Sequence, residues 1–124
     1  MNLSKVRIFV VALLVILSLT SIASTTQAQA AYIARDALIH AVGNTSYELP
    51  VFVVKVSGGT GACGNSTITF PESTLPDPNN PAYIRLYERA YSTALTAFAA
   101  GKRVDIYNYD GSDCDNASFI EVKQ

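Results

Sequence analysis

One strongly bounded helix, at residues 81–100, is the feature that most constrains the fold of this chain. Asn80 can cap the first turn, and Pro81 suits the first helical position, where no backbone donor is required. Gly101 is the expected stop, because glycine readily adopts the left-handed conformation that ends many helices. The chain therefore has to place a single long helix among segments of a different kind.

Those other segments carry strand patterns. β-Branched and aromatic residues, or an alternation of apolar and polar residues, predict strands at residues 51–56, 66–70, 103–109 and 117–122. The segment Asp36–Val42 is short and apolar and fits either a strand or a helix, and residues 43–50 form a turn-rich break. With Asp36–Val42 taken as a strand, the order of elements is β-β-β-α-β-β.

The helix has an unusually wide apolar side. At 100° per residue its apolar residues fill one half of the circumference: Tyr83, Ile84, Leu86, Tyr87, Ala90, Tyr91, Ala94, Leu95, Ala97 and Phe98. One face of a sheet needs a narrower stripe. We interpret the helix as core that covers the end of a barrel, and the alternative is an interface with a partner subunit.

The N-terminus has the layout of a secretory signal peptide. Lys5 and Arg7 supply positive charge, and an unbroken apolar run follows at residues 8–19. Small residues then lead to Ala28 and Ala30, which form an A-x-A cleavage site. The apolar run is shorter than the roughly 20 residues that a membrane-spanning helix needs. We therefore expect export and cleavage, with no membrane anchor in the mature protein.

Cleavage would remove residues 1–30 and leave residues 31–124 as a single domain, periplasmic or secreted. The leader holds two of the nine basic side chains and none of the ten acidic ones, so the net charge becomes −3. A mildly acidic domain gains little from phosphate contacts, which argues against a nucleic-acid partner.

Cys63 and Cys114 are the two cysteines of the sequence. In an exported protein the expectation is one disulfide between them. Closing a loop of about 50 residues would stabilise a small domain by about 4 kcal/mol in the chain-entropy description.

A glycine motif lies between two predicted strands. Gly59, Gly61 and Gly64 spell G-x-G-x-x-G, the pattern of a dinucleotide-binding loop. That loop works when a helix follows, whereas the strand at residues 66–70 follows here. In the overlapping P-loop pattern, Asn65 stands where the phosphate-binding lysine is required. We interpret the motif as a hairpin connection with positive φ angles and expect no nucleotide and no cofactor.

A metal site is one reading of the acidic turn near the C-terminus. Asp110, Asp113 and Asp115 could bind Ca²⁺ through oxygen ligands. Their spacing does not match an EF-hand loop, and no distal glutamate completes the set. We favour an ordinary turn, since Asp, Gly, Ser and Asn are common turn residues.

Tyr107 and Tyr109 share one face of a predicted strand and could stack on sugar rings or bases. The favoured interpretation is that they pack under the helix beside Tyr83, Tyr87 and Tyr91, because large aromatic side chains are mostly buried.

Catalysis is not expected. His40 is the single histidine, and acid–base or metal chemistry needs partners that the sequence does not place, so we assign it a structural role. No serine or cysteine lies in a recognisable nucleophile motif, and no catalytic residue is assigned. A small hydrolase that depends on His40 is the one enzymatic alternative.

Two blocks of sequence carry a resemblance, at residues 54–71 and 89–122. Their SGGTG-x-C turn, A-x-x-A-L-T helix with a GK stop, and YNY…C…ASFIEV ending resemble a family of small exported proteins of Gram-negative bacteria. That family has no assigned function, so the resemblance implies no site residues.

The order of elements is also similar to the OB-fold B subunits of bacterial five-fold toxins of the subtilase-cytotoxin and pertussis type, which bind host glycans. An OB barrel has five strands with a helix between the third and fourth. In that plan the third and fifth strands pair in parallel. Cys63 precedes the third strand and Cys114 the fifth, so the plan allows the bridge.

We therefore expect an α+β, OB-like five-stranded barrel with one helix and one disulfide. The leading hypothesis for function is an exported, non-catalytic binding module that recognises a glycan or a protein partner, with the helix available for homo-oligomerisation. The alternative is a monomeric periplasmic envelope or stress-associated protein in which the barrel is a scaffold.

Overall fold

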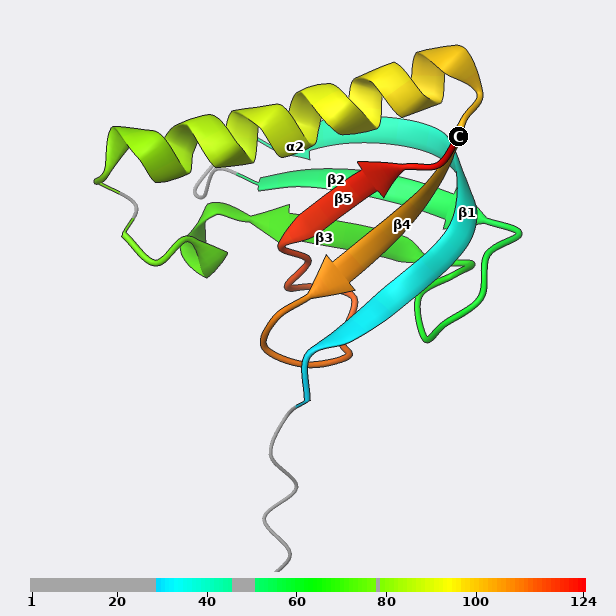
Figure 1. The fold of residues 1–124 in the computed structure, drawn as a ribbon, viewed down its shortest axis with the longest axis horizontal. Helices are drawn as coiled ribbons and strands as arrows, with labels where there is room; N and C mark the ends of the chain where they lie inside the picture. The colour runs from blue at the N-terminus through cyan, green and yellow to red at the C-terminus, as the bar shows by residue number, and fades with distance from the viewer. Residues whose placement is uncertain (1–28, 46–50, 78) are drawn as a thin grey trace, which may run out of the picture.

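A computed structural model describes residues 29–45, 51–77 and 79–124 (Figure 1). Its elements are β1 (Ala31–Thr45), β2 (Val51–Ser57), β3 (Thr67–Pro71), the 3₁₀ turn η1 (Glu72–Thr74), α2 (Pro81–Ala100), β4 (Arg103–Asn108) and β5 (Phe119–Val122). Residues 1–28 of the predicted signal peptide lie outside the described residues. β1 begins directly after the predicted cleavage site.

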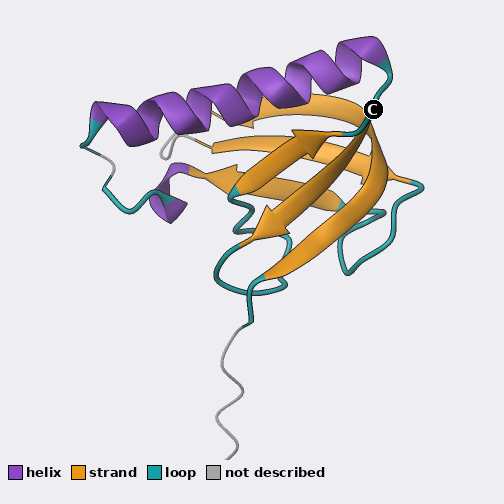
Figure 2. Cartoon of the chain, in the orientation of Figure 1, coloured by secondary structure: helices purple, strands orange, loops and turns teal. Residues whose placement is uncertain are grey.

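The five strands form one antiparallel sheet in the order β3-β2-β1-β4-β5. α2 lies across the sheet, and the long, strongly curved β1 contributes to both halves of it (Figures 1 and 2). This is the strand order of an OB barrel opened between its third and fifth strands. The predicted α+β, OB-like class, the order of elements and the single disulfide are confirmed.

The sheet is not closed into a barrel by a strand ladder in the described part of the chain. Two backbone hydrogen bonds bridge the opening: the N–H of Thr69 donates to Cys114 at 2.8 Å, and the N–H of Ala117 donates to the carbonyl of Thr69 at 3.0 Å. The segment before β5 therefore takes the place next to β3. The predicted parallel pairing of the third and fifth strands is reduced to these two bonds, because β5 starts only at Phe119.

β1 is longer than the sequence indicated. It extends beyond Asp36–Val42 at both ends and includes residues 43–45, which were assigned to a break. Its first half pairs with β4 and its second half with β2, and shifts of register interrupt both ladders. Such bulges bend a strand and increase its twist. They allow one strand to serve both halves of a curved sheet.

The core lies between the curved sheet and the helix. Its largest fully buried apolar side chains are Ile33, Phe52, Val54, Ile68, Phe70, Val104 and Ile106. The apolar residues of the alternating patterns in β3 and β4 therefore face this core. The rings of Phe52 and Phe70 stack on neighbouring strands with centroids 4.4 Å apart.

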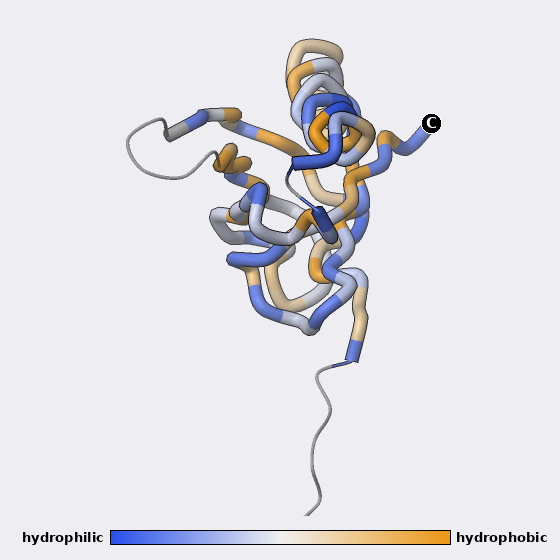
Figure 3. Tube along the Cα trace, turned by 90° about the vertical axis from the view of Figure 1, so that its left-hand side faces the viewer, coloured by the Kyte–Doolittle hydropathy of each residue, from blue (hydrophilic) through white to orange (hydrophobic). Residues whose placement is uncertain are grey.

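α2 begins and ends where its terminal residues predicted. The side chain of Asn80 accepts a hydrogen bond from the N–H of Ala82 at 3.0 Å. Gly101 ends the helix with φ 61°, in the left-handed region. Figure 3 views the helix nearly end-on above the sheet. No helix among the described residues is long and apolar enough to cross a membrane.

The apolar half of α2 is only partly covered. Ala94 and Ala97 are fully buried, whereas Leu86, Leu95 and Phe98 are 52%, 40% and 46% exposed. The prediction that the whole half forms core is wrong for these three residues. The two alanines hold the centre of the helix face against the sheet, and the flanks of the helix extend beyond it.

The glycine motif is the connection between β2 and β3, as predicted, and a strand follows it. Gly61 has φ +92°, and a Cβ atom there would lie 2.7 Å from the carbonyl oxygen of Ile33. The N–H of Cys63 donates to that same carbonyl at 2.7 Å. Glycine at this position lets the connection close onto β1 and places Cys63 in the core.

Candidate functional site

A groove runs beside the helix. Two adjoining cavities of about 490 and 390 Å³ lie between α2 and the segment that leads from β4 into β5. They share Leu86, Ala90, Tyr109 and Ser118. Each volume falls within the range of about 300–1,000 Å³ that small-molecule sites occupy. We name the combined feature the α2–β5 groove.

A third cavity, of about 380 Å³, continues the groove along the helix past Arg89 and Thr93 to Thr96. The groove therefore follows α2 from Tyr83 to Thr96, which is about 20 Å at the rise of an α-helix. Its length suits an extended ligand better than a single ring.

The charged group that borders the groove changes along its length, while the exposed walls stay mainly apolar. The first cavity is bordered mainly by apolar and aromatic side chains, among them Phe70, Tyr83 and Tyr87, with Asp110 as its charged group. The third cavity is bordered by one serine, two threonines and one valine, with Arg89 as its charged group; the threonine hydroxyls bond to helix carbonyls, and most of the exposed wall is apolar. The two charged residues of opposite sign thus border different parts of the groove, Asp110 the first cavity and Arg89 the second and third.

Tyr109 stands where the first two cavities meet and is 59% exposed. The expectation that it packs in the core is wrong, because β4 ends at Asn108 and Tyr109 lies beyond the sheet. Tyr107 is half-buried and does not line the groove. Its ring lies 4.9 Å from those of both Tyr109 and Tyr32, edge to face, on the side of β4 opposite Val104 and Ile106.

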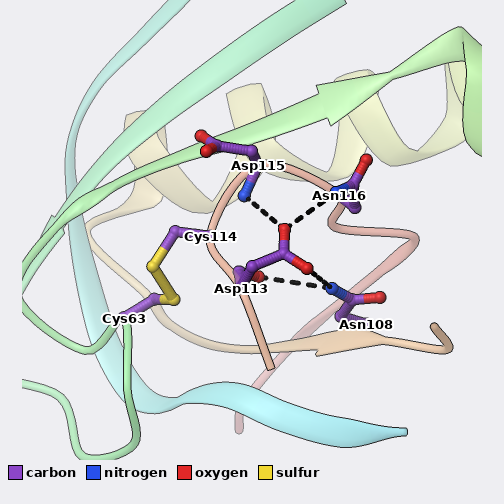
Figure 4. Close-up of a disulfide and its surroundings, with 6 residues drawn as sticks. All are labelled: Cys63, Asn108, Asp113, Cys114, Asp115 and Asn116. Carbon is purple, nitrogen blue, oxygen red and sulfur yellow. Dashed lines mark hydrogen bonds between the residues drawn. A yellow bond between two sulfur atoms is a disulfide. The ribbon is translucent and has the colours of Figure 1, made fainter. Parts of the chain in front are cut away.

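Asn108 fixes the point at which the chain leaves β4. It is fully buried. Its Oδ1 accepts from the N–H of Asp110 at 2.8 Å. Its Nδ2 donates to the backbone and side-chain oxygens of Asp113, both at 3.3 Å (Figure 4). These bonds set the path of the backbone from Asn108 to Asp113, and with it the direction of Tyr109 and Asp110.

The predicted disulfide between Cys63 and Cys114 is present, with the two Cα atoms 5.8 Å apart. Cys63 is fully buried in the connection between β2 and β3, and Cys114 lies in the segment between β4 and β5 (Figure 4). The bridge joins the segment between β4 and β5, which forms one wall of the groove, to the connection between β2 and β3. A disulfide is also compatible with an oxidising compartment.

A family described as being of unknown function, DUF5992, matches residues 9–124. The chain belongs to DUF5992. No curated protein and no solved structure matches it. The comparisons do not confirm the resemblance to toxin B subunits.

In this DUF5992 protein the acidic turn is held by its own hydrogen bonds. The carboxylate of Asp113 accepts from the N–H of Asp115 at 3.0 Å and from the side-chain amides of Asn116 and Asn108 at 2.9 and 3.3 Å (Figure 4). Loss of some hydration acts to raise the pKa of Asp113, but these donors outweigh it and hold the pKa below its ordinary value.

That arrangement bears on the metal hypothesis for Asp110, Asp113 and Asp115. Among the described residues, no three His, Cys, Asp or Glu side chains are grouped so as to hold a metal ion. The structure thus does not bring the three carboxylates together as a ligand set. It shows the hydrogen-bonded turn that the residue types favour.

Tyr87 forms part of the wall of the first cavity. Its hydroxyl donates to the carbonyl of Phe70 at 3.1 Å. Burial raises the pKa of Tyr87 above its ordinary value, and the negative charge of Glu72 raises it further. The phenol is therefore neutral at physiological pH.

His40 contacts a residue that the sequence did not pair with it. It is exposed on β1, and its Nε2 is hydrogen-bonded to Oγ of Ser57 on β2. A nucleophilic serine also needs donors for the oxyanion. The N–H groups of Gly58 and Gly59, which follow Ser57, donate to other residues of the same loop. We assign the pair no catalytic role.

Sequence reasoning did not place Leu86, Arg89 or Ser118 in a site. The width of the apolar stripe on α2 was a signal for Leu86, since a residue at its margin is a candidate for an exposed wall. Arg89 and Ser118 carried no local signal, because their neighbours across the groove come from a distant part of the chain.

Proposed function

We propose that this protein is a non-catalytic binding module that recognises an oligosaccharide in the α2–β5 groove. One observation carries the proposal. Tyr109 presents a largely exposed ring in a groove about 20 Å long, between apolar walls and polar groups.

A sugar matches this combination of groups. One side of a pyranose ring presents C–H groups that pack on an aromatic face, while its rim presents hydroxyls. Tyr109 supplies the aromatic face. The carboxylate of Asp110 and the hydroxyl oxygen of Ser118, beside it, can accept hydrogen bonds from the rim; the Ser118 proton is donated to the carbonyl of Asn116.

An acyl chain matches less well. Its binding energy comes from removing apolar surface from water, at about 25 cal/mol per Å². The walls at Tyr109 and Leu86 are themselves more than half exposed, so a chain resting on them would stay largely in water. A sugar keeps its hydroxyls hydrated in the same position.

The site is held in place before any ligand binds. Asn108 holds the start of the segment between β4 and β5, where Tyr109 lies, and the disulfide holds the same segment at Cys114. Ser118 is fixed as well, since its N–H donates to the carbonyl of Tyr107 at 2.9 Å. A preformed wall reduces the entropy lost on binding.

A protein partner is the second candidate, and the exposed side chains of Leu86, Phe119 and Val122 beside the groove favour it. Apolar side chains at the rim of a groove are typical of protein interfaces as well. The test below separates the two candidates, because a protein partner does not require affinity for free sugars.

The experiment is a glycan-array screen of the oxidised, exported protein, followed by calorimetric titration of the best ligand. Tyr109→Ala is expected to weaken binding by about 10-fold, in line with the loss of one aromatic contact. Phe98→Ala is the matched control, because Phe98 is 46% exposed and lines none of the three cavities.

Binding that survives Tyr109→Ala unchanged would contradict the groove as the site. An array without any ligand would contradict the function itself and leave the scaffold hypothesis in its place. Affinity for a protein without affinity for sugars would favour the second candidate.

A further inference from the structure

We infer that the ligand of the α2–β5 groove is an anionic oligosaccharide, and that Arg89 binds its carboxylate. The inference rests on the proposed function. It adds the charge of the ligand and the residue that binds the charged group.

Arg89 borders both the second and the third cavity, so its side chain lies along the middle and far parts of the groove. Ser92, Thr93 and Ser118 border the same parts. The hydroxyls of Thr93 and Ser118 already donate to the carbonyls of Arg89 and Asn116. The guanidinium group therefore supplies the directed donors that bind a carboxylate on a sugar.

Arg89 has no acidic partner within the described part of the chain. The ion pairs found there join Arg103 to Asp36 and Lys123 to Asp105. On the helix, the positions three and four residues from Arg89 hold Arg85, Leu86, Ser92 and Thr93, none of them acidic. The charge of Arg89 is therefore not balanced by a neighbour on its own helix.

Arg85 lies one turn before Arg89, and like charges at this spacing destabilise a helix by a few tenths of a kcal/mol. Glu88 lies three residues after Arg85 and can offset its charge, whereas Arg89 has no acidic residue three or four positions away. An anion bound beside Arg89 would supply that missing counter-charge.

Asp110 gives the ligand a direction. It borders the first cavity, where Arg89 does not reach, and Arg89 borders the other two. A carboxylate placed near Asp110 would be repelled, whereas a neutral sugar there can donate a hydroxyl to it. The anionic group of the ligand therefore belongs in the part of the groove that Arg89 borders.

The test compares charged and neutral forms of the same sugars. Tetramers of galacturonate and of mannuronate are titrated calorimetrically, each beside its methyl ester, in which the carboxylate charge is absent. We expect at least one acid to bind about 10-fold or more tightly than its ester, as for a charge-assisted hydrogen bond. Raising the ionic strength should weaken binding of the acid more than binding of the ester.

Substitutions assign the effect to a residue. Arg89→Gln is expected to remove the preference for the acid and to leave affinity for the ester unchanged. Arg89→Lys should keep part of the preference, since lysine retains the charge but not the planar fork. Arg85→Gln is the matched control, because it makes the same change of charge one turn away and borders none of the three cavities.

The outcomes separate the two proposals. Equal affinity for acid and ester would overturn the anionic ligand and leave oligosaccharide binding intact. If no tetramer binds while a neutral glycan binds through Tyr109, the anionic ligand is likewise overturned and oligosaccharide binding stands. An equal effect of Arg85→Gln and Arg89→Gln would overturn the role of Arg89. Absence of binding to any glycan would remove both proposals.

Discussion

The carboxylate of Asp105 on β4 accepts a hydrogen bond of 2.6 Å from the backbone N–H of Asp36 on β1. Asp36 has φ 54°, a left-handed conformation that is uncommon outside glycine. Its carbonyl accepts a hydrogen bond from Nη1 of Arg103, also on β4. Two side chains of β4 thus satisfy the backbone groups that the bulge of β1 removes from the ladder.

Asp105→Ala should therefore destabilise the fold by about 2 kcal/mol, the cost of leaving a partly buried N–H without an acceptor. Urea unfolding measures the change. Glu121→Ala is the control, because Glu121 pairs with Asp105 in register on β5 but is exposed. Equal effects of the two substitutions would show that Asp105 does not support the bulge.

The disulfide makes a second prediction. Cys63 and Cys114 are 51 residues apart, and removal of their bond should lower the free energy of unfolding by about 4 kcal/mol. The double substitution to alanine and the wild-type protein in reductant should melt at similar temperatures, both below the oxidised wild type. A wild-type melting curve that does not respond to reductant would refute this contribution.

A third prediction concerns Asn108, whose substitution should lower both the stability of the fold and the affinity for glycan. Asn108→Ala removes the acceptor for the N–H of Asp110 and the donors to Asp113, and should cost about 2–3 kcal/mol. It should also weaken glycan binding, although Asn108 lines none of the three cavities. Binding at the wild-type affinity in a correctly folded Asn108→Ala variant would argue against positioning by this residue.

Asp113 makes a prediction about pH. Its pKa is lowered in the folded protein, so it stabilises the fold above the unfolded value of about 3.9 and loses that contribution as the pH falls toward the folded value. Asp113→Asn should reduce the loss of melting temperature below about pH 4. The effect should be small because the residue is exposed. An acid transition identical to that of the wild type would contradict it.

Local signals in the sequence were enough for much of the fold. Asn80 and Gly101 bound the helix through interactions within a few residues of themselves, and the structure shows both. The alternation of Ile68 and Phe70 with threonines favoured a strand, and the structure buries the two apolar residues on one side of β3. These features depend on short-range chemistry, which a single sequence displays directly.

Long-range arrangements were less accessible. β1 is irregular, because its bulges break the alternation that marks a strand, and Asp36 is satisfied by residues from β4 that lie far along the chain. The exposure of Tyr109 depends on the end of β4 and on the limited width of the sheet. The groove itself exists only because α2 and the segment before β5 come together.

The most direct test of the central claim is an NMR titration of ¹⁵N-labelled oxidised protein with the best-binding oligosaccharide. Binding in the α2–β5 groove predicts shifts of the amide signals of Leu86, Arg89, Tyr109 and Ser118. The signals of His40 and Ser57, at the pair outside the groove, should stay in place. Shifts centred on that pair, or none at saturating ligand, would contradict the claim.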